Sequence, residues 1–245
     1  MIKGLIFSIQ FLTRIPLKAE IEMNSRNISA STFFFPFTGA LIGTVAAAAY
    51  YIGLWGGRNI AALCAVAALI IITGGLHLDG LSDTCDGFFS SRTRDRILEI
   101  MKDSHIGSFG VIAIVMDILA KYVLLSGIEK SFLPCLILAS ANARLAAVLL
   151  MCFTKTARPG GLGAMFSAAA GRKYFYLGAL IYILMISIYN PSYLATILAA
   201  AVAALLTAIK AYSTIGGLTG DVYGAAIELC EIASIAAFLV VIKWI

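Results

Sequence analysis

The sequence predicts an all-α membrane protein, a polytopic bundle of about seven transmembrane helices. Hydrophobic residues make up 61% of the 245 residues and charged residues only 13%, against roughly 45–50% and 25% in soluble domains. The mean hydropathy is +0.96. Because a helix needs roughly 20 residues to cross a hydrocarbon core of about 30 Å, we expect one integral-membrane domain over residues 1–245.

Seven apolar windows provide the expected spans. They cover residues 32–54, 59–76, 106–127, 132–153, 174–189, 193–211 and 222–244. Windows of this length and apolar character are typical of membrane-spanning helices. The N-terminal segment MIKGLIFSIQFLTRIPL has no small-residue cleavage site after its apolar run, so we do not interpret it as a signal peptide.

The basic residues predict an orientation in the membrane. If the segment 77–105 faces the cytoplasm, the outer ends of the spans receive only Arg58, Lys130 and Lys243. The cytoplasmic side receives Lys3, Arg14, Lys18, Arg26, Arg92, Arg94, Arg96, Lys102, Lys155, Arg158, Arg172, Lys173 and Lys210. This division predicts a multi-pass protein of the cytoplasmic (inner) membrane. Anionic lipid explains the net charge of +5 without a nucleic-acid partner.

An acidic stripe follows the second span, in the segment GGLHLDGLSDTCDGFFSSRTRDRILEIMKDSHIGSFG. Asp79, Asp83 and Asp86 stand at i, i+4 and i+7, which places them on a helical stripe about 60° wide. Three like charges on one stripe repel each other, and a divalent cation removes that penalty. Mg²⁺ commonly uses one or two carboxylates together with substrate phosphates. We therefore expect a magnesium site at these residues, with a solvated acidic helix end as the alternative.

An amphipathic helix is expected to begin near Thr93 and to lie at the cytoplasmic membrane surface. Glu99 and Asp103, four residues apart, form a second carboxylate pair. The basic residues of this region are Arg92, Arg94, Arg96 and Lys102. They are candidates for binding phosphate oxygens, and an ordinary lipid-facing role is the alternative. His77 and His105 bracket the acidic segment and are further candidates for substrate binding or catalysis.

Two glycine-rich segments, 155–173 and 213–231, are expected on the same side. Three glycines beside Arg158 predict a flexible anion-binding loop, with a plain interhelical turn as the alternative; they are Gly160, Gly161 and Gly163. Asp221 opens the last span. Arg158 and Asp221 are therefore candidate substrate-binding residues.

Charged residues inside the spans need either a partner or a function, because an unpaired charge in the bilayer is costly. Asp117 and Lys121, four residues apart, are expected to pair with each other. Glu228 lies seven residues after Asp221, hence on the same face, and Glu231 follows one turn later. Arg144 and Glu228 are candidates for substrate binding, and a structural ion pair between Arg144 and these acids is the alternative.

Several blocks resemble the cobalamin synthase family, the adenosylcobinamide-GDP ribazoletransferases of cobamide biosynthesis. They are FLTRIP, the long acidic segment, ARPGGLG and GGLTGDVYGAAIELCE, which span nearly the whole chain in the expected order. The resemblance implies an inner-membrane enzyme, with its active site facing the cytoplasm, that joins adenosylcobinamide-GDP to α-ribazole or its 5′-phosphate. A ribose hydroxyl would attack a phosphoryl group and release GMP. Mg²⁺ at the aspartates would neutralise the diphosphate.

The acidic segment also loosely resembles the metal motif of CDP-alcohol phosphotransferases. Asp83, Asp86 and Gly87 match its first part. In that family two more aspartates follow on a later helix, and Glu99 and Asp103 match their spacing with Glu in place of the first Asp. Ser90-Ser91 stands where that family has Ala-Arg. The candidate catalytic residues are therefore Asp83, Asp86, Glu99 and Asp103, and a lipid synthase is the second hypothesis.

Two other classes of protein were weighed. Asp117, Glu228 and Glu231 within spans would suit an ion-coupled transporter, but the sequence suggests no paired broken helices in the two halves. A noncatalytic scaffold would leave the acidic stripe unexplained. The choice between free and phosphorylated ribazole, the lower-ligand base and assembly into a homo-oligomer stay open.

Overall fold

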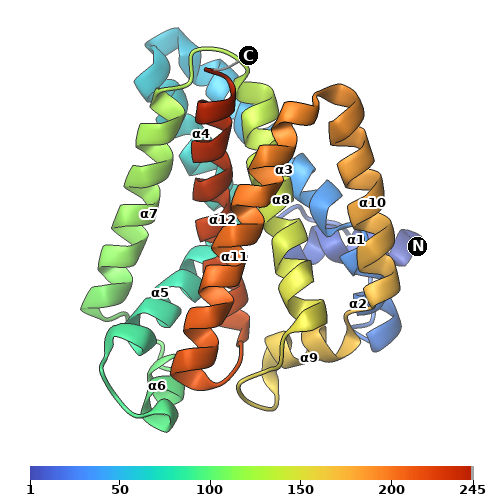
Figure 1. Cartoon of the computed structure of the whole chain (residues 1–245), viewed down its shortest axis with the longest axis vertical. Coiled ribbons are helices and arrows are strands. Elements are labelled where there is room, and N and C mark those ends of the chain that lie inside the picture. Colours follow the sequence, from blue (N-terminus) through green and yellow to red (C-terminus); the bar gives the residue numbers. More distant parts are fainter. Residues whose placement is uncertain (244–245) are drawn as a thin grey trace.

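The computed structural model describes residues 1–243, and this part of the chain folds into helices without a β-strand (Figure 1). The α-helices are α1 (Ile2–Leu12), α2 (Ser25–Thr32), α3 (Phe35–Gly53), α4 (Arg58–Thr73), α5 (Leu76–Phe89), α6 (Arg94–Ile100), α7 (Ser108–Ser126), α8 (Phe132–Phe153), α9 (Gly161–Ala169), α10 (Arg172–Tyr189), α11 (Leu194–Ile215) and α12 (Gly220–Val241). Short 3-10 turns follow α3 and precede α11. The predicted all-α fold is confirmed.

Membrane-spanning helices account for most of the bundle. Helices α3, α7, α8, α11 and α12 are each long and apolar enough to cross a membrane. Two bent pairs, α4 with α5 and α9 with α10, raise the number to seven if each pair is one span. The prediction of about seven spans holds in this form. The expectation of no paired broken helices is wrong, because one bent pair lies in each half of the chain.

Small residues bring α3 directly against α8, a helix that is buried over most of its length. A Cβ atom added to Gly39 would lie 2.8 Å from the Cα atom of Ala141, and one added to Gly43 would lie 2.6 Å from the Cα atom of Ile137. Close approach of backbones at small residues is a common way to pack helices in a membrane, where burial in lipid gives little drive to associate. This contact makes a rigid centre for the bundle.

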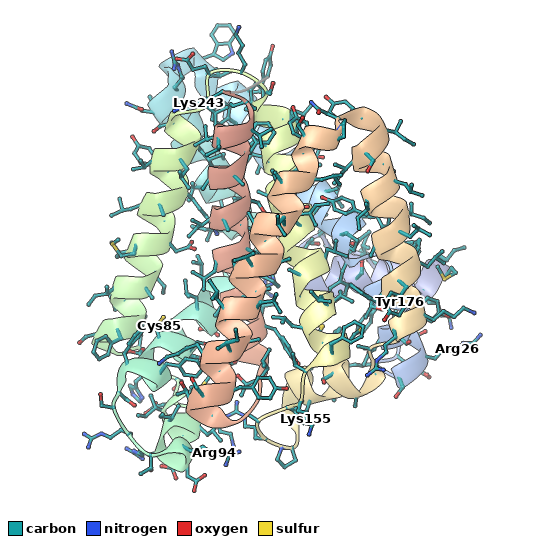
Figure 2. All side chains as sticks on the ribbon, viewed as in Figure 1. Arg26, Cys85, Arg94, Lys155, Tyr176 and Lys243 are labelled. Carbon is teal, nitrogen blue, oxygen red and sulfur yellow. The ribbon has the colours of Figure 1, made fainter. Side chains whose placement is uncertain are left out.

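One end of the bundle, here called the acidic end, gathers α5, α6, α9 and the loops around residues 155 and 217 (Figure 1). The two loops pair through their backbones, since Ala157 N–H donates to Leu218 O and Leu218 N–H donates to Lys155 O, each at 2.9 Å. Arg94 and Lys155 lie at this end and Lys243 at the opposite end (Figure 2). The acidic end therefore carries the segments in which the sequence concentrates its charge.

Candidate active site

A sharp bend places α5 across the acidic end. Gly74 and Gly75 have φ angles of 66° and 72°, which glycine adopts without steric cost, and the axes of α4 and α5 differ by 89°. Helix α5 then packs against α12, where a Cβ atom on Gly80 would lie 2.7 Å from the carbonyl oxygen of Asp221. The predicted helix under the acidic stripe is confirmed, and it faces the first turn of α12.

The carboxylates of Asp79, Asp83 and Asp221 lie close enough to influence one another electrostatically where α5 contacts α12. Asp83 interacts electrostatically with Asp79 and Asp221, and Arg158 is the cation that opposes them. Arg158 is 3.5 Å from an Asp221 oxygen and also donates to the carbonyl oxygen of Leu98 at 3.0 Å. One shared arginine leaves an excess of negative charge, and hard oxygen atoms of this kind suit a divalent cation. Asp79 and Asp83 are the carboxylates of α5 that are free for this role.

Asp86 has a different position from the one predicted. Its two oxygens accept hydrogen bonds from the backbone N–H groups of Gly107 and Gly110, both at 2.8 Å. These groups belong to the first turn of α7, where N–H groups lack partners within the helix. Asp86 thus fastens α7 to α5. The sequence did not indicate this capping role, because α7 returns to the end of the acidic stripe only in the folded chain. The assignment of Asp86 as a metal ligand and catalytic residue stays a prediction.

We expect Asp86→Ala to lower the free energy of unfolding by about 1–2 kcal/mol, the usual cost of a lost helix cap. Thermal unfolding in detergent measures this, with Asp95→Ala as the control. Asp95 is highly exposed and forms its one salt bridge with the adjacent Arg94. A variant that kept its stability but lost its activity would return Asp86 to the chemistry.

Two cavities meet at Asp79. The first, here called the aromatic cavity, has a volume of about 260 Å³ and is lined by Phe11, Phe35, His77, Asp79, Arg158, Phe166, Thr219, Asp221 and apolar neighbours. The second, the acidic cavity, has a volume of about 270 Å³ and is lined by Asp79, Ser82, Asp83, Lys102, Asp103 and neighbours. Because Asp79 lines both, the two cavities are neighbours at this side chain.

An open basic cleft of about 560 Å³ adjoins the acidic cavity, since Asp103 lines both. Its other polar residues are Asp86, Ser90, Arg92, Arg96, His105 and Ser108. Asp103 forms a hydrogen bond with the His105 ring at 2.7 Å, and this bond holds the pKa of Asp103 below its usual range. Asp103 is therefore ionised at neutral pH. Arg92, Arg96, Lys102, Asp103 and His105 are brought together as predicted.

Two other predicted residues of this segment lie apart from the cavities. Arg94 donates to the carbonyl oxygens of Ile215 at 2.9 Å and Ala157 at 2.6 Å, so it ties α6 to both loops of the acidic end. Its role in phosphate binding stays a prediction beside this structural one. Glu99 forms an exposed salt bridge with Arg96 at 2.7 Å and lines none of the three spaces described above.

The predicted anion-binding loop is helical from Gly161 onward, because α9 begins there. Gly160 and Gly161 have positive φ angles and start the helix. A Cβ atom on Gly163 would lie 2.7 Å from the Cα atom of Gly220. This close approach sets α9 against the start of α12, and the glycines of this segment form part of the wall of the aromatic cavity.

A buried ion network lies deeper in the bundle. Lys121 contacts Asp117 at 3.2 Å and Glu231 at 2.8 Å, and it also pairs with Glu228. The expected pairing of Asp117 with Lys121 is confirmed. Arg144 pairs with Glu231. The ion pairs of the structural alternative are thus present, and neither Arg144 nor Glu228 lines the aromatic cavity, the acidic cavity or the basic cleft. Their role in substrate binding stays a prediction.

His77 connects this ion network with the site. It is buried, lines the aromatic cavity, and its Nδ1 atom lies 3.4 Å from an Arg144 nitrogen. The residues that the sequence analysis missed are the aromatic ones, Phe11, Phe35 and Phe166. They come from three distant helices, and an apolar residue in an apolar chain carries no signal of its own.

Comparison with known proteins gives a family match over nearly the whole chain. The family described as cobalamin-5-phosphate synthase matches residues 4–239. Similar curated proteins are the adenosylcobinamide-GDP ribazoletransferases of Clostridium novyi (strain NT), 39% identical over 97% of this chain and 96% of the relative, and of Treponema denticola, 33% identical over 94% and 95%. The enzyme of the same name from Escherichia coli (strain K12 / DH10B) is 36% identical over 94% and 97%. No solved structure matches the chain.

Proposed function

The chain belongs to the cobalamin-5-phosphate synthase family, and from this we propose that it is an adenosylcobinamide-GDP ribazoletransferase. Its substrates are then adenosylcobinamide-GDP and α-ribazole or α-ribazole 5′-phosphate. One structural observation supports the proposal beyond the family match. A set of carboxylates lies at the contact of α5 with α12, beside a cleft whose lining includes Arg92 and Arg96. This combination suits phosphoryl transfer, in which positioning and neutralisation of phosphate charge provide most of the catalysis.

The proposed reaction is one substitution at phosphorus. A bond forms between a ribose hydroxyl oxygen and the phosphorus atom next to the cobinamide. The bond from that phosphorus to the oxygen of GMP breaks, and GMP leaves. The hydroxyl proton passes to a carboxylate, for which we propose Asp103, because it lines both the acidic cavity and the basic cleft.

We propose that Asp79 and Asp83 hold Mg²⁺ together with the diphosphate. Within residues 1–243 no three His, Cys, Asp or Glu side chains are placed to hold one metal ion, so a cation at Asp79 and Asp83 would need its remaining ligands from substrate and water. The bound ion would neutralise the diphosphate and stabilise the leaving GMP. Lys102, Arg92 and Arg96 line the adjoining spaces and would bind the remaining phosphate charge.

We further propose that the protein lies in the inner membrane with its acidic end toward the cytoplasm. Helices long enough to span a membrane support the multi-pass placement. A group of basic residues falls in the segments at or next to the acidic end, as the positive-inside rule requires of a cytoplasmic face; they are Arg92, Arg94, Arg96, Lys102, Lys155 and Arg158. Water-soluble nucleotides would then reach the site directly.

Mass spectrometry of the reaction products tests this function. Purified protein in liposomes receives adenosylcobinamide-GDP, α-ribazole and Mg²⁺, and we expect a cobamide and GMP in equal amounts. Parallel reactions contain α-ribazole 5′-phosphate, or a CDP-alcohol donor with an alcohol acceptor. Product from the CDP-alcohol pair alone would contradict the proposal in favour of a lipid synthase.

Removal of the divalent cation is expected to abolish product formation, because the carboxylates and the diphosphate would then repel each other. Excess EDTA should reduce the rate to the level of a reaction without protein, and added Mg²⁺ should restore it. Circular dichroism before and after the treatment controls for unfolding. Full activity in EDTA would exclude a divalent cation from the reaction.

A further inference from the structure

We infer that the aromatic cavity binds the nucleoside acceptor, with its aromatic base among the phenylalanine rings and its ribose at Asp79 and Asp221. The inference rests on the proposed function and deepens it, because it gives the two substrates separate places at the acidic end. It also assigns the residues that select the acceptor.

One wall of the cavity is a cluster of aromatic rings. The ring centroids of Phe11 and Phe166 are 4.4 Å apart, and those of Phe35 and Phe166 are 6.0 Å apart. Phe166 and Phe35 are fully buried, so their rings are held in place before any ligand binds. Planar aromatic ligands pack favourably against such rings in stacked or edge-on arrangements. A cavity with this wall suits the fused aromatic base of a ribazole.

The size of the cavity separates the two substrates. Its volume of about 260 Å³ is close to the lower end of the roughly 300–1,000 Å³ typical of small-molecule sites. A nucleoside with one base and one sugar is of this scale, whereas the corrin macrocycle with its side chains is several times larger. The corrin macrocycle must therefore stay outside, and a raised KM for adenosylcobinamide-GDP in the test below would place the guanosine of that substrate here instead of the acceptor.

The polar side of the cavity provides partners for a sugar. Asp79 and Asp221 line it, and the Thr219 hydroxyl donates to an Asp221 oxygen at 3.2 Å. Carboxylates accept hydrogen bonds from ribose hydroxyls. Because Asp79 also lines the acidic cavity, a ribose held there would present a hydroxyl to the space in which the diphosphate is bound.

Filling the cavity tests the inference. Ala164 lies on α9, is half-buried and lines the cavity, so Ala164→Leu would occupy part of the space for the base. Ala168→Leu makes the same change one turn later, at an exposed position that does not line the cavity. Unfolding temperatures of both variants show whether the fold survives.

We expect Ala164→Leu to raise the KM for α-ribazole about tenfold or more, a change worth about 1.4 kcal/mol of binding. The KM for adenosylcobinamide-GDP should stay within about twofold of the wild-type value, as should both constants for Ala168→Leu. Isothermal titration of α-ribazole into the EDTA-treated protein gives a second readout without turnover. It should show the same loss of affinity for Ala164→Leu alone.

Unchanged α-ribazole binding by folded Ala164→Leu, or a raised KM for the corrinoid instead, would overturn the inference. If Ala164→Leu does not fold, Phe11→Leu decides, because it removes one ring from the aromatic wall while keeping an apolar side chain. Unchanged α-ribazole binding by that variant overturns the inference too. Failure of the proposed function is distinguishable. It would appear as a wild-type protein that makes no cobamide, whereas failure of this inference leaves wild-type turnover intact.

Discussion

Asp83→Asn is expected to reduce turnover about 100- to 1,000-fold, the range seen when one charge-stabilising group is removed from an active site. Asp83 lines the acidic cavity together with Asp79, where its negative charge would hold the cation that neutralises the diphosphate. Asparagine keeps the shape of the side chain but removes this charge. The initial rate of GMP release at saturating substrates measures the effect.

The same variant should fold and insert normally. Among the described residues Asp83 makes no hydrogen bond or salt bridge that asparagine would break, and its loss relieves repulsion between neighbouring carboxylates. Asp95→Asn on α6 is the matched control, because Asp95 is exposed, and it should keep wild-type turnover. Normal Mg²⁺-dependent turnover by Asp83→Asn would show that the cation is held elsewhere.

Lys121→Ala is expected to lower the free energy of unfolding by about 3–5 kcal/mol, the usual cost of breaking a buried ion pair from one side. Lys121 is the common partner of Asp117, Glu228 and Glu231 inside the bundle. Without it, three buried carboxylates share Arg144 alone, which pairs with only one of them, Glu231. Most of the variant should fail to accumulate as folded protein.

The yield of monodisperse protein after detergent extraction and its unfolding temperature measure this effect. Lys130→Ala, an exposed lysine between α7 and α8, makes the same change without burial and should match the wild type. The double variant Lys121→Met with Glu228→Gln removes one charge of each sign and should recover part of the loss. If Lys121→Ala were as stable as Lys130→Ala, the buried network would not hold the bundle together.

Local patterns explain what the sequence predicted correctly. Apolar windows placed the spans, and the spacing of Asp79 and Asp83 placed them on one helix, because both features depend only on neighbours along the chain. The spacing of Asp117 and Lys121 likewise predicted their contact. The bend between α4 and α5 also has a local cause in Gly74 and Gly75, and two consecutive glycines after an apolar window were a signal that could have revealed it.

Tertiary contacts explain the rest. Whether Asp86 binds a ligand or caps α7 depends on where α7 begins in space, 21 residues away along the chain. Arg94 was predicted to bind phosphate because it is basic and stands in a basic segment, but its partners are carbonyl oxygens of two distant loops. Side chains with several competing partners cannot be assigned from sequence spacing alone.

The central claim is that the carboxylates of α5 hold the catalytic cation. A titration with Mn²⁺, followed by electron paramagnetic resonance, tests this claim most directly. The wild type, Asp83→Asn and Asp95→Asn are compared with adenosylcobinamide-GDP present and the acceptor omitted, so that no turnover occurs. Asp83→Asn should weaken Mn²⁺ binding about tenfold or more, at least the cost of losing a supporting residue at a metal site, while Asp95→Asn binds as the wild type does. Equal Mn²⁺ affinity in all three proteins would contradict the claim.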